Sequence, residues 1–265
     1  MKKLFSLATL CCAFALASCN MPKDGDTEIV TEEYLGSYIG AYANPTDVEL
    51  LAGKGEDKFF LSATFKRDLV RLLKEKDKEK FLQLSKYYKD DEYHNKWQVV
   101  YKYDSKVGAW LAPLTGLPPV VPTVLKDSIF SVSVVSNRSF GEAYPAGAEL
   151  KDLITFHALS INDFIVSGYK PSKPTEPVKE WIKKAYFNAF SGSMIDNLMP
   201  FMLGRNNHFI PVSYPLNEVN QKNTRLISPS FLLVFKEHPL VGEHTFTVRV
   251  KFADKELTGT IKHLF

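Results

Sequence analysis

Apolar and polar residues alternate most regularly near the C-terminal end of the chain. Every second position there is apolar, namely Phe246, Val248, Val250 and Phe252. This is the period of a strand with one buried face. Leu257 and Ile261 repeat the pattern after a turn at 254–255, and an even loop that pairs Phe252 with Leu257 keeps both apolar sets on one face. The pattern therefore predicts a β-hairpin.

Shorter strand patterns precede this hairpin. Phe130, Val132 and Val134 alternate with serines, and the continuous apolar run 231–235 suits a strand that is covered on both faces. Short strands of this kind are typical of an immunoglobulin-like sandwich. We therefore predict a β-sandwich (immunoglobulin-like) module over residues 123–265.

The first half of the chain mixes helical and strand patterns. Tyrosines recur every four residues at 34, 38 and 42, which predicts a short amphipathic helix between 33 and 45. Helical spacing of apolar residues predicts a longer helix over 64–89, and the alternation over 97–103 predicts a strand. Prolines clustered in 117–122 mark a boundary. The predicted fold class is therefore α+β, with a small α+β module over 34–116 followed by the β-sandwich module.

A helical insertion is predicted to interrupt the second module at 175–204. Thr175 can cap its first helix, and its second segment, from 194 onwards, is apolar nearly all round. Methionine-rich surfaces adapt to varied partners. The insertion is therefore a possible binding surface, made of Trp181, Met194, Met199, Phe201 and Met202. The alternative is a helix buried in the core, which the same apolar pattern fits.

The N-terminal segment has the pattern of a targeting sequence. Lys2 and Lys3 precede an almost unbroken apolar run at 4–16, and small residues follow it. This is the pattern of a secretory signal peptide, here residues 1–18. A helix of about 13 residues reaches only about 20 Å, which is less than the thickness of a bilayer's hydrocarbon core. We therefore expect this segment to be cleaved rather than to span the membrane.

The stretch Leu16-Ala17-Ser18-Cys19 resembles the lipobox of bacterial lipoproteins. The resemblance implies cleavage before Cys19, to which a diacylglyceryl group and a further fatty acid such as palmitate are attached. The only other cysteines, at 11 and 12, would leave with the signal peptide, so the mature chain could form no internal disulfide. The alternative is an ordinary signal peptide followed by an unmodified cysteine.

The residues after Cys19 bear on where the anchored chain resides. Asn20 stands where an aspartate would signal retention in the inner membrane, so the resemblance implies the outer membrane. Residues 19–33 form an acidic tether that resembles the export signal of surface-exposed Bacteroidota lipoproteins. The same stretch fits a solvated linker that holds the domain away from the bilayer. We therefore expect a lipid-anchored protein of the outer membrane, facing either the periplasm or the cell surface.

Charge limits the classes of partner. Loss of Lys2 and Lys3 with the signal peptide reduces the 33 basic residues to 31, against 30 acidic ones. Lysines and acidic residues alternate in sign at 74–80, as they do on a solvated helix face. Nucleic-acid binding would call for a basic patch of one sign, and the sequence has none. We therefore expect the membrane, an envelope protein or a glycan as partners, and no nucleic acid.

Few residues suggest catalysis or metal binding. Ser167 and Lys170 have the spacing of a serine–lysine pair, but Pro171 follows them and an extended segment is predicted where the pair needs a helix. His244 lies diagonal to His263 in the predicted hairpin, without the helical spacing of a zinc site. We therefore predict no catalytic residue, no metal and no cofactor.

Two weaker resemblances concern the second module. Asp127-Ser128-Ile129 resembles the O-glycosylation signal of exported Bacteroidota proteins, with Ser128 as the modified residue at the start of a strand. The stretch from Ser128 through Tyr144 to Gly147, together with the final hairpin, resembles Bacteroidota lipoproteins that have sandwich domains. That resemblance implies a location and a fold, and no activity.

Three classes of function remain open on these patterns. The first is a non-catalytic, lipid-anchored protein that binds a partner protein or a glycan, or takes part in envelope assembly. The second is a hydrolase of cell-wall or dietary polymers, which would bring carboxylates together in a cleft. The third is an adhesin or fimbrial subunit, which would offer an exposed strand or a groove to a donor strand. The absence of a catalytic motif favours the first.

Overall fold

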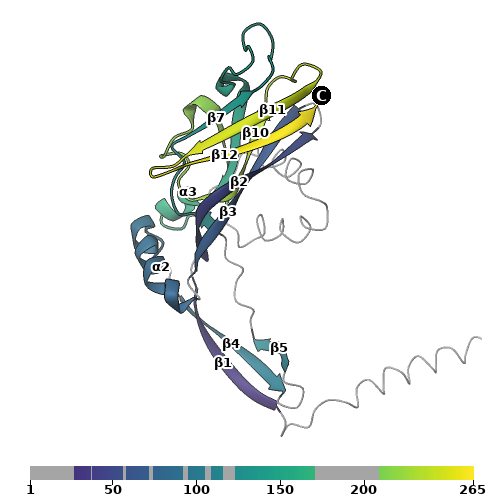
Figure 1. Ribbon diagram of the computed structural model, residues 1–265. Coiled ribbons are helices and arrows are strands. Elements are labelled where there is room, and N and C mark those ends of the chain that lie inside the picture. Colours follow the sequence, from purple (N-terminus) through teal and green to yellow (C-terminus); the bar gives the residue numbers. More distant parts are fainter. Residues whose placement is uncertain are drawn as a thin grey trace, which may run out of the picture. The chain divides into compact units, whose positions relative to one another are not determined.

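The computed structural model describes residues 27–36, 38–55, 58–71, 74–91, 95–104, 109–115, 123–170 and 209–265. The chain divides into two compact units (Figure 1). The larger unit holds residues 37–94 and 120–265, and the smaller unit holds residues 1–36 and 95–119. Both units consist mainly of β-strands in the part described, which agrees with the β-rich second module that was predicted, whereas the first half contains more strand than the predicted α+β module.

The larger unit contains a six-stranded sheet in the order β6-β2-β3-β10-β8-β9. Its strands are β2 (Ala41–Gly55), β3 (Lys58–Arg71), β6 (Thr123–Leu125), β8 (Ile154–Ser160), β9 (Ile210–Pro215) and β10 (Ile227–Phe235). All neighbours are antiparallel except β2 and β6, which pair in parallel. β10 lies between β3 and β8 and is buried at all but one position, which agrees with the covered strand predicted at 231–235.

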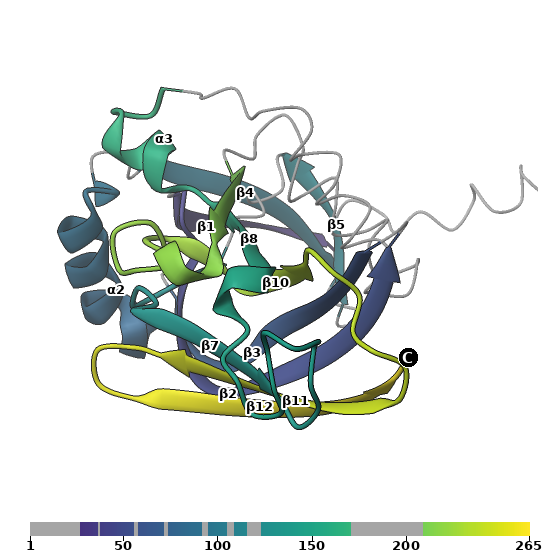
Figure 2. The ribbon, with the colours of Figure 1, turned by 90° about the horizontal axis from the view of Figure 1, so that it is seen from above.

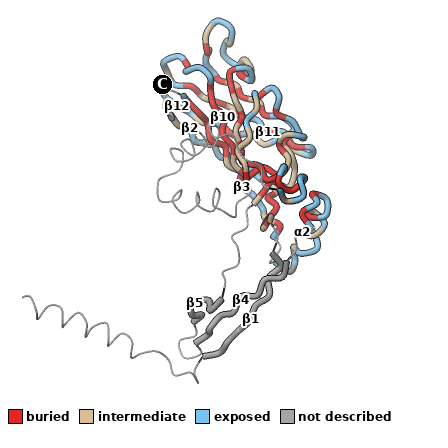
Figure 3. Tube along the Cα trace, turned by 180° about the vertical axis from the view of Figure 1, so that it is seen from behind, coloured by how far each residue is buried: buried red, intermediate tan, exposed pale blue. Residues whose placement is uncertain are grey.

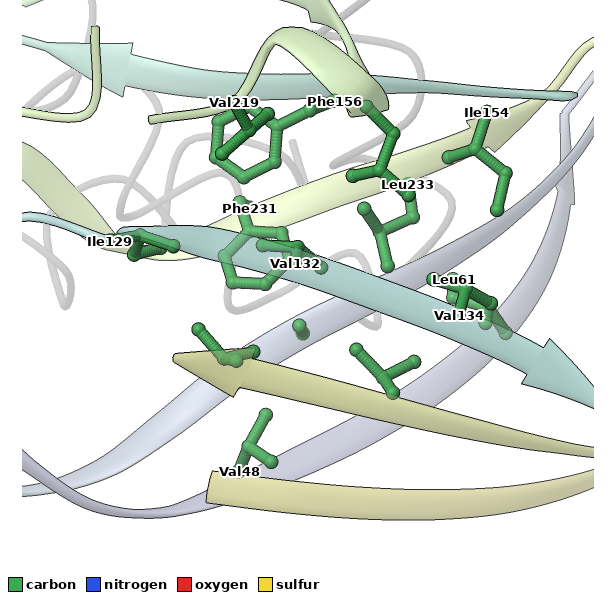
Figure 4. Packing of buried hydrophobic residues seen from close by; sticks show 14 of the residues in the cluster. Val48, Leu61, Ile129, Val132, Val134, Ile154, Phe156, Val219, Phe231 and Leu233 are labelled. Atoms are coloured by element: carbon green, nitrogen blue, oxygen red, sulfur yellow. The ribbon is translucent and has the colours of Figure 1, made fainter. Parts of the chain in front are cut away.

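A three-stranded sheet, β12-β11-β7, shares its core with the six-stranded one (Figure 2). Its strands are β7 (Ser131–Ser136), β11 (Glu243–Lys251) and β12 (Glu256–Leu264). Figure 4 shows Val132 and Val134 of β7 in the same cluster as Phe156 of β8 and Phe231 of β10. Buried residues recur along these strands and give way to exposed ones at the loops (Figure 3). Burial between the two sheets is therefore the main stabilising term of this unit.

Short helices connect or cover the strands of the larger unit. They are α2 (Glu75–Tyr88), α3 (Asn162–Val166), and the 3-10 turns η4 (Lys151–Leu153) and η5 (Leu216–Glu218). Phe81 and Tyr88 of α2 are buried, whereas its lysines are exposed. Lys89 ends the helix in the left-handed conformation with φ of 62°, and its N–H donates to the Lys86 carbonyl. α2 therefore has an amphipathic pattern, in which only one face joins the core.

The C-terminal hairpin forms on the predicted face but in a different register. Val250 pairs with Leu257 and Phe246 with Ile261, so the predicted pairing of Phe252 with Leu257 is wrong by two residues. Phe252 instead belongs to the turn, where its N–H donates to the Lys255 carbonyl at 2.8 Å. Apolar alternation determines only which residues share a face, and a shift by two residues leaves the faces unchanged.

The two helices predicted in the first half are corrected by the structure. The segment predicted as a helix over 33–45 contains the end of β1 (Thr27–Gly36) and the start of β2. The long helix predicted over 64–89 is limited to α2, since residues up to Arg71 belong to β3. A spacing of four residues is also an even number, so the tyrosines at 34, 38 and 42 fit a strand period as well as a helical one.

The predicted division at 116–123 differs from the units that form. β2 and β3 come from the predicted first module, yet β3 pairs with β10 of the second, with Thr64 opposite Ser230. Cross-strand pairing therefore joins the two predicted modules into one sheet. Residues 27–33 of the predicted tether form part of β1. The predicted helical insertion, 175–204, lies outside the described residues.

The smaller unit contains the sheet β1-β4-β5. β4 (Asn95–Asp104) confirms the strand predicted at 97–103, and β5 (Ala109–Thr115) follows it. β1 and β4 pair antiparallel without a break over ten residues each, with Tyr34 opposite Trp97 and Val30 opposite Tyr101. β4 and β5 are also antiparallel, with register shifts near Tyr101.

Candidate functional site

Most residues singled out from the sequence lie outside the described residues. These are Cys19 and the possible binding surface made of Trp181, Met194, Met199, Phe201 and Met202. Lipid attachment at Cys19 and binding by the insertion therefore stay predictions.

Ser128 lies in the connection between β6 and β7, three residues before the strand that it was expected to start. It is half-buried, and its neighbour Ile129 is fully buried. The Asp127 carboxylate accepts an ion pair from the Lys126 Nζ at 3.1 Å. A sugar attached to Ser128 would have to extend into solvent beside the exposed residues of this connection. Glycosylation of Ser128 therefore stays a prediction.

His244 of the hairpin has a structural role. Its side chain is fully buried, its Nε2 donates to the Leu240 carbonyl at 2.9 Å, and its Nδ1 lies 2.9 Å from the Ser136 hydroxyl. Since a carbonyl only accepts, Nε2 carries a proton. His263 lies directly opposite in the register, not diagonally as predicted. Within the described residues, no group of three or more His, Cys, Asp or Glu could hold a metal ion.

Ser167 and Lys170 form no serine–lysine pair through the serine hydroxyl. Ser167 directly follows α3, so the extended segment predicted at 163–167 is wrong. The Ser167 hydroxyl bonds to the backbone, with the Phe164 carbonyl 3.0 Å and the Lys170 carbonyl 3.1 Å away. These bonds close the turn after α3 and give the hydroxyl a local structural role.

His157 of β8 gives the fold a pH dependence. Burial lowers its pKa to about 4 from an ordinary value of 6.5, and the nearby charge of Lys58 adds to this. The unfolded chain therefore binds more protons than the folded one between pH 6.5 and 4, so stability falls as the pH falls through this range. We expect a loss of about 3 kcal/mol in the free energy of unfolding from this group. In urea titrations at several pH values, His157→Phe should lack this loss of unfolding free energy between pH 6.5 and 4. If the free energy of unfolding depends on pH equally in the parent and the variant, the assignment to His157 is contradicted.

The best candidate for a functional site is the surface at the C-terminal end of α2. Tyr88 is only 4% exposed, whereas its neighbour Tyr87 is 71% exposed. The two rings meet edge to face, with their centroids 4.8 Å apart. The guanidinium of Arg225 lies 5.0 Å from the centre of the Tyr88 ring and 5.8 Å from that of Tyr87. We call Tyr87, Tyr88 and Arg225 the Tyr–Arg surface.

The turn that carries Arg225 is held by hydrogen bonds to the core. The Thr224 hydroxyl lies 2.8 Å from the Ile129 carbonyl and 2.9 Å from that of Asn220. The Ser160 hydroxyl donates to the carbonyl of Arg225 itself at 3.1 Å. Nη2 of Arg225 donates a long bond of 3.4 Å to the Tyr87 carbonyl. The guanidinium is thus positioned by its own backbone and by the two rings.

An aromatic base supports the Tyr–Arg surface from below. Tyr88 stacks on Tyr42 with a centroid distance of 5.7 Å, and Tyr42 contacts Phe81 at 5.1 Å. The Tyr88 hydroxyl donates to the Lys126 carbonyl, and the Tyr42 hydroxyl lies 3.4 Å from that of Ser85. Burial raises the pKa of Tyr88 to about 12, an increase that Asp127 adds to and Arg225 opposes, and burial also raises the pKa of Tyr42. Both phenols are therefore neutral at physiological pH.

This geometry suits recognition. Tyrosine combines a large apolar ring with a polar tip, and arginine offers several donors in a fixed plane. Both residue types are enriched among those that dominate binding energy at interfaces. The surface holds an exposed ring beside a guanidinium on a rigid base, so it can accept an apolar group and a hydrogen-bond acceptor together.

Sequence reasoning missed the Tyr–Arg surface. Tyr87 and Arg225 are 138 residues apart, and no motif links them. Asp90 is fully buried at the same end of α2. No helix in the described ranges is both long and apolar enough to cross a membrane. No protein-family model matches the chain, and neither the curated proteins nor the solved structures contain a match.

Proposed function

We propose that the chain is a lipid-anchored protein of a bacterial outer membrane that binds a partner protein through the Tyr–Arg surface. The anchor rests on the resemblance of Leu16–Cys19 to a lipobox, behind a segment with the pattern of a signal peptide. A stable anchor of this kind would keep the larger unit at the membrane. The observation that carries the binding role is the 71% exposure of Tyr87 beside the Arg225 guanidinium.

A protein partner suits this surface for two reasons. An exposed aromatic ring gains most from burial when a partner covers it completely, as happens at the centre of a protein interface. The guanidinium already lies over the Tyr88 ring, so little conformational entropy is lost when it binds a carbonyl or carboxylate of the partner.

We further propose that the larger unit is an immunoglobulin-like β-sandwich. Its six-stranded and three-stranded sheets contribute to one hydrophobic cluster, which is the arrangement of two packed layers. In such folds the loops and connections carry binding residues while the sheets provide a rigid support. Arg225 lies in such a connection, two residues before β10 begins, and Tyr87 lies at the end of α2.

The binding role is tested by capture from an envelope fraction with matched variants. Tyr87→Ala should weaken capture of the partner by about 10-fold or more, since truncation of a central aromatic residue typically costs over 1 kcal/mol. Its melting temperature should stay within about 2 °C of the parent, because the ring is mostly exposed. Arg225→Lys should weaken capture as well, because lysine keeps the charge but lacks the planar group with several donors.

Thr258→Ala, an exposed position on β12, is the matched control and should capture as much partner as the parent. Capture of the same polypeptides by all four proteins would refute a role for the Tyr–Arg surface.

A further inference from the structure

The two segments that form the Tyr–Arg surface carry basic residues and no acidic ones. The C-terminal part of α2 with its cap, residues 82–89, contains Lys86 and Lys89. The turn at 219–226 contains Lys222 and Arg225. The three lysines are exposed, as is the ring of Tyr87. The charge on both sides of the exposed ring is therefore positive.

The acidic residues next to these segments leave this exposed charge mainly positive. Asp90, which follows the cap of α2, is fully buried. Asp127, which lies near Tyr88, already accepts an ion pair from Lys126 at 3.1 Å. Asp91 is exposed and is the exception. The surface thus suits a ligand of negative charge.

The guanidinium of Arg225 has unused hydrogen-bonding capacity. Within the described residues, it forms no ion pair with a carboxylate, and its one hydrogen bond is the long one to the Tyr87 carbonyl. Its Nε is buried and has no hydrogen-bond partner. A guanidinium holds five N–H donors in a fixed plane, and a carboxylate can accept two of them side by side. Arg225 can therefore bind a carboxylate that another molecule supplies.

Backbone strain is concentrated at the same place. In the described part of the chain, the residues other than glycine with a positive φ are Lys89, Tyr169 and Leu226, at 62°, 61° and 51°. Lys89 directly follows Tyr88, and Leu226 directly follows Arg225. The Tyr169 hydroxyl donates to the Lys89 carbonyl at 3.1 Å. Such conformations are costly for residues with a side chain and cluster at ligand clamps, which supports a binding role here.

We propose that the partner presents an acidic peptide segment to the Tyr–Arg surface, with one carboxylate bound side by side to two N–H groups of Arg225. This inference rests on the proposed function and adds the chemical class of the ligand. Further carboxylates of the segment face Lys86, Lys89 and Lys222, and an apolar residue among them covers the Tyr87 ring. Complementary charge of this kind speeds association and selects the partner.

Fluorescence polarisation of a labelled peptide, measured with the full chain, tests this proposal. The probe is a short synthetic peptide in which Asp and Glu surround one leucine, and its counterpart has Asn and Gln at the acidic positions. We expect saturable binding of the acidic peptide, about 10-fold weaker binding of the amide counterpart, and weaker binding as the salt concentration rises. Arg225→Gln should weaken binding by about 10-fold or more.

Two further variants keep the test decisive. Lys76→Gln removes an exposed lysine near the start of α2, about 16 Å along the helix from Tyr87, and should bind like the parent. If Arg225→Gln fails to fold, the double variant Lys86→Gln with Lys222→Gln replaces it, because both lysines are exposed. This double variant should weaken binding by about 3-fold or more and should reduce its dependence on salt.

Equal affinities for the acidic peptide and its amide counterpart, or for Arg225→Gln and Lys76→Gln, would overturn the proposal. Tighter binding of polygalacturonate than of the peptide would overturn it too, since the ligand would then be an acidic polysaccharide.

Competition separates this proposal from the proposed partner. In an envelope fraction, the acidic peptide should reduce the crosslink from a photoreactive group at position 87, and the amide counterpart should not. A crosslink that the acidic peptide leaves unchanged would contradict an acidic ligand while the partner protein stands. If the peptide binds the parent but position 87 gives no crosslink, the site for an acidic segment stands and the partner protein does not.

Discussion

Val250→Asp is expected to lower the free energy of unfolding of the larger unit by about 3–5 kcal/mol, because it leaves an unpaired charge in the core. Val250 is fully buried, and on β11 it lies between Val132 of β7 and Leu257 of β12. An aspartate there loses its hydration among apolar strand partners. Urea unfolding, followed by far-ultraviolet circular dichroism, measures the effect.

Lys251→Asp is the matched control for this prediction. Lys251 is the next residue of β11, is exposed, and pairs with Glu256 of β12 and Ser131 of β7. Replacing it by aspartate places two acidic groups opposite each other at the surface, which costs about 1 kcal/mol or less. Equal unfolding midpoints for the two variants would show that the faces of β11 are wrongly assigned.

Cys19→Ser is expected to abolish lipid attachment and to release the protein from membranes. Serine offers no thiol for the diacylglyceryl group, and each buried CH₂ of an acyl chain contributes about 0.8 kcal/mol to membrane binding. Incorporation of radiolabelled palmitate, followed by fractionation of membranes, measures both effects.

Cys11→Ser and Cys12→Ser provide controls, because both cysteines lie within the segment that is expected to be cleaved. Each should incorporate as much label as the parent. Labelled palmitate in Cys19→Ser, or its absence from the parent, would remove the lipoprotein assignment.

Patterns along the sequence predicted individual strands better than their partners. β7, β10 and β11 lie where alternating or continuous apolar residues indicated strands, because burial of one or both faces leaves a local trace. The choice of which strands pair with each other leaves no comparable pattern in the sequence. The contact of β3 with β10 joins residues such as Ala63 and Phe231, and it is determined by which faces fit together in the core.

The hairpin between β2 and β3 was missed because its pattern has two interpretations. Phe59, Leu61, Ala63 and Phe65 alternate like a strand, but the residues between them at 60 and 62 are also buried. Burial of both faces hides the period of two. The lysine-rich segment α2 follows β3 in the sequence. Because the helical spacing of apolar residues in α2 already begins within β3, the predicted helix started too early.

The candidate site could not be predicted from the sequence for a different reason. Tyr87 and Tyr88 are identical in type and adjacent, yet one is mostly exposed and the other is buried. The difference arises because α2 is oriented so that the Tyr88 ring packs on Tyr42. Arg225, which lies in a turn far away in the sequence, covers the Tyr88 ring as well. By contrast, the strand pattern over 97–103 was visible in the sequence, and β4 confirms it.

A photoreactive phenylalanine derivative at position 87, introduced in intact cells, tests the proposed binding role most directly. With Cys19 intact, we expect a crosslink to one envelope protein from position 87 and none from position 258 on β12. Arg225→Lys should reduce the yield of this crosslink, since it removes the planar group beside Tyr87. Equal crosslinking from positions 87 and 258, or none from position 87, would contradict a partner-binding Tyr–Arg surface.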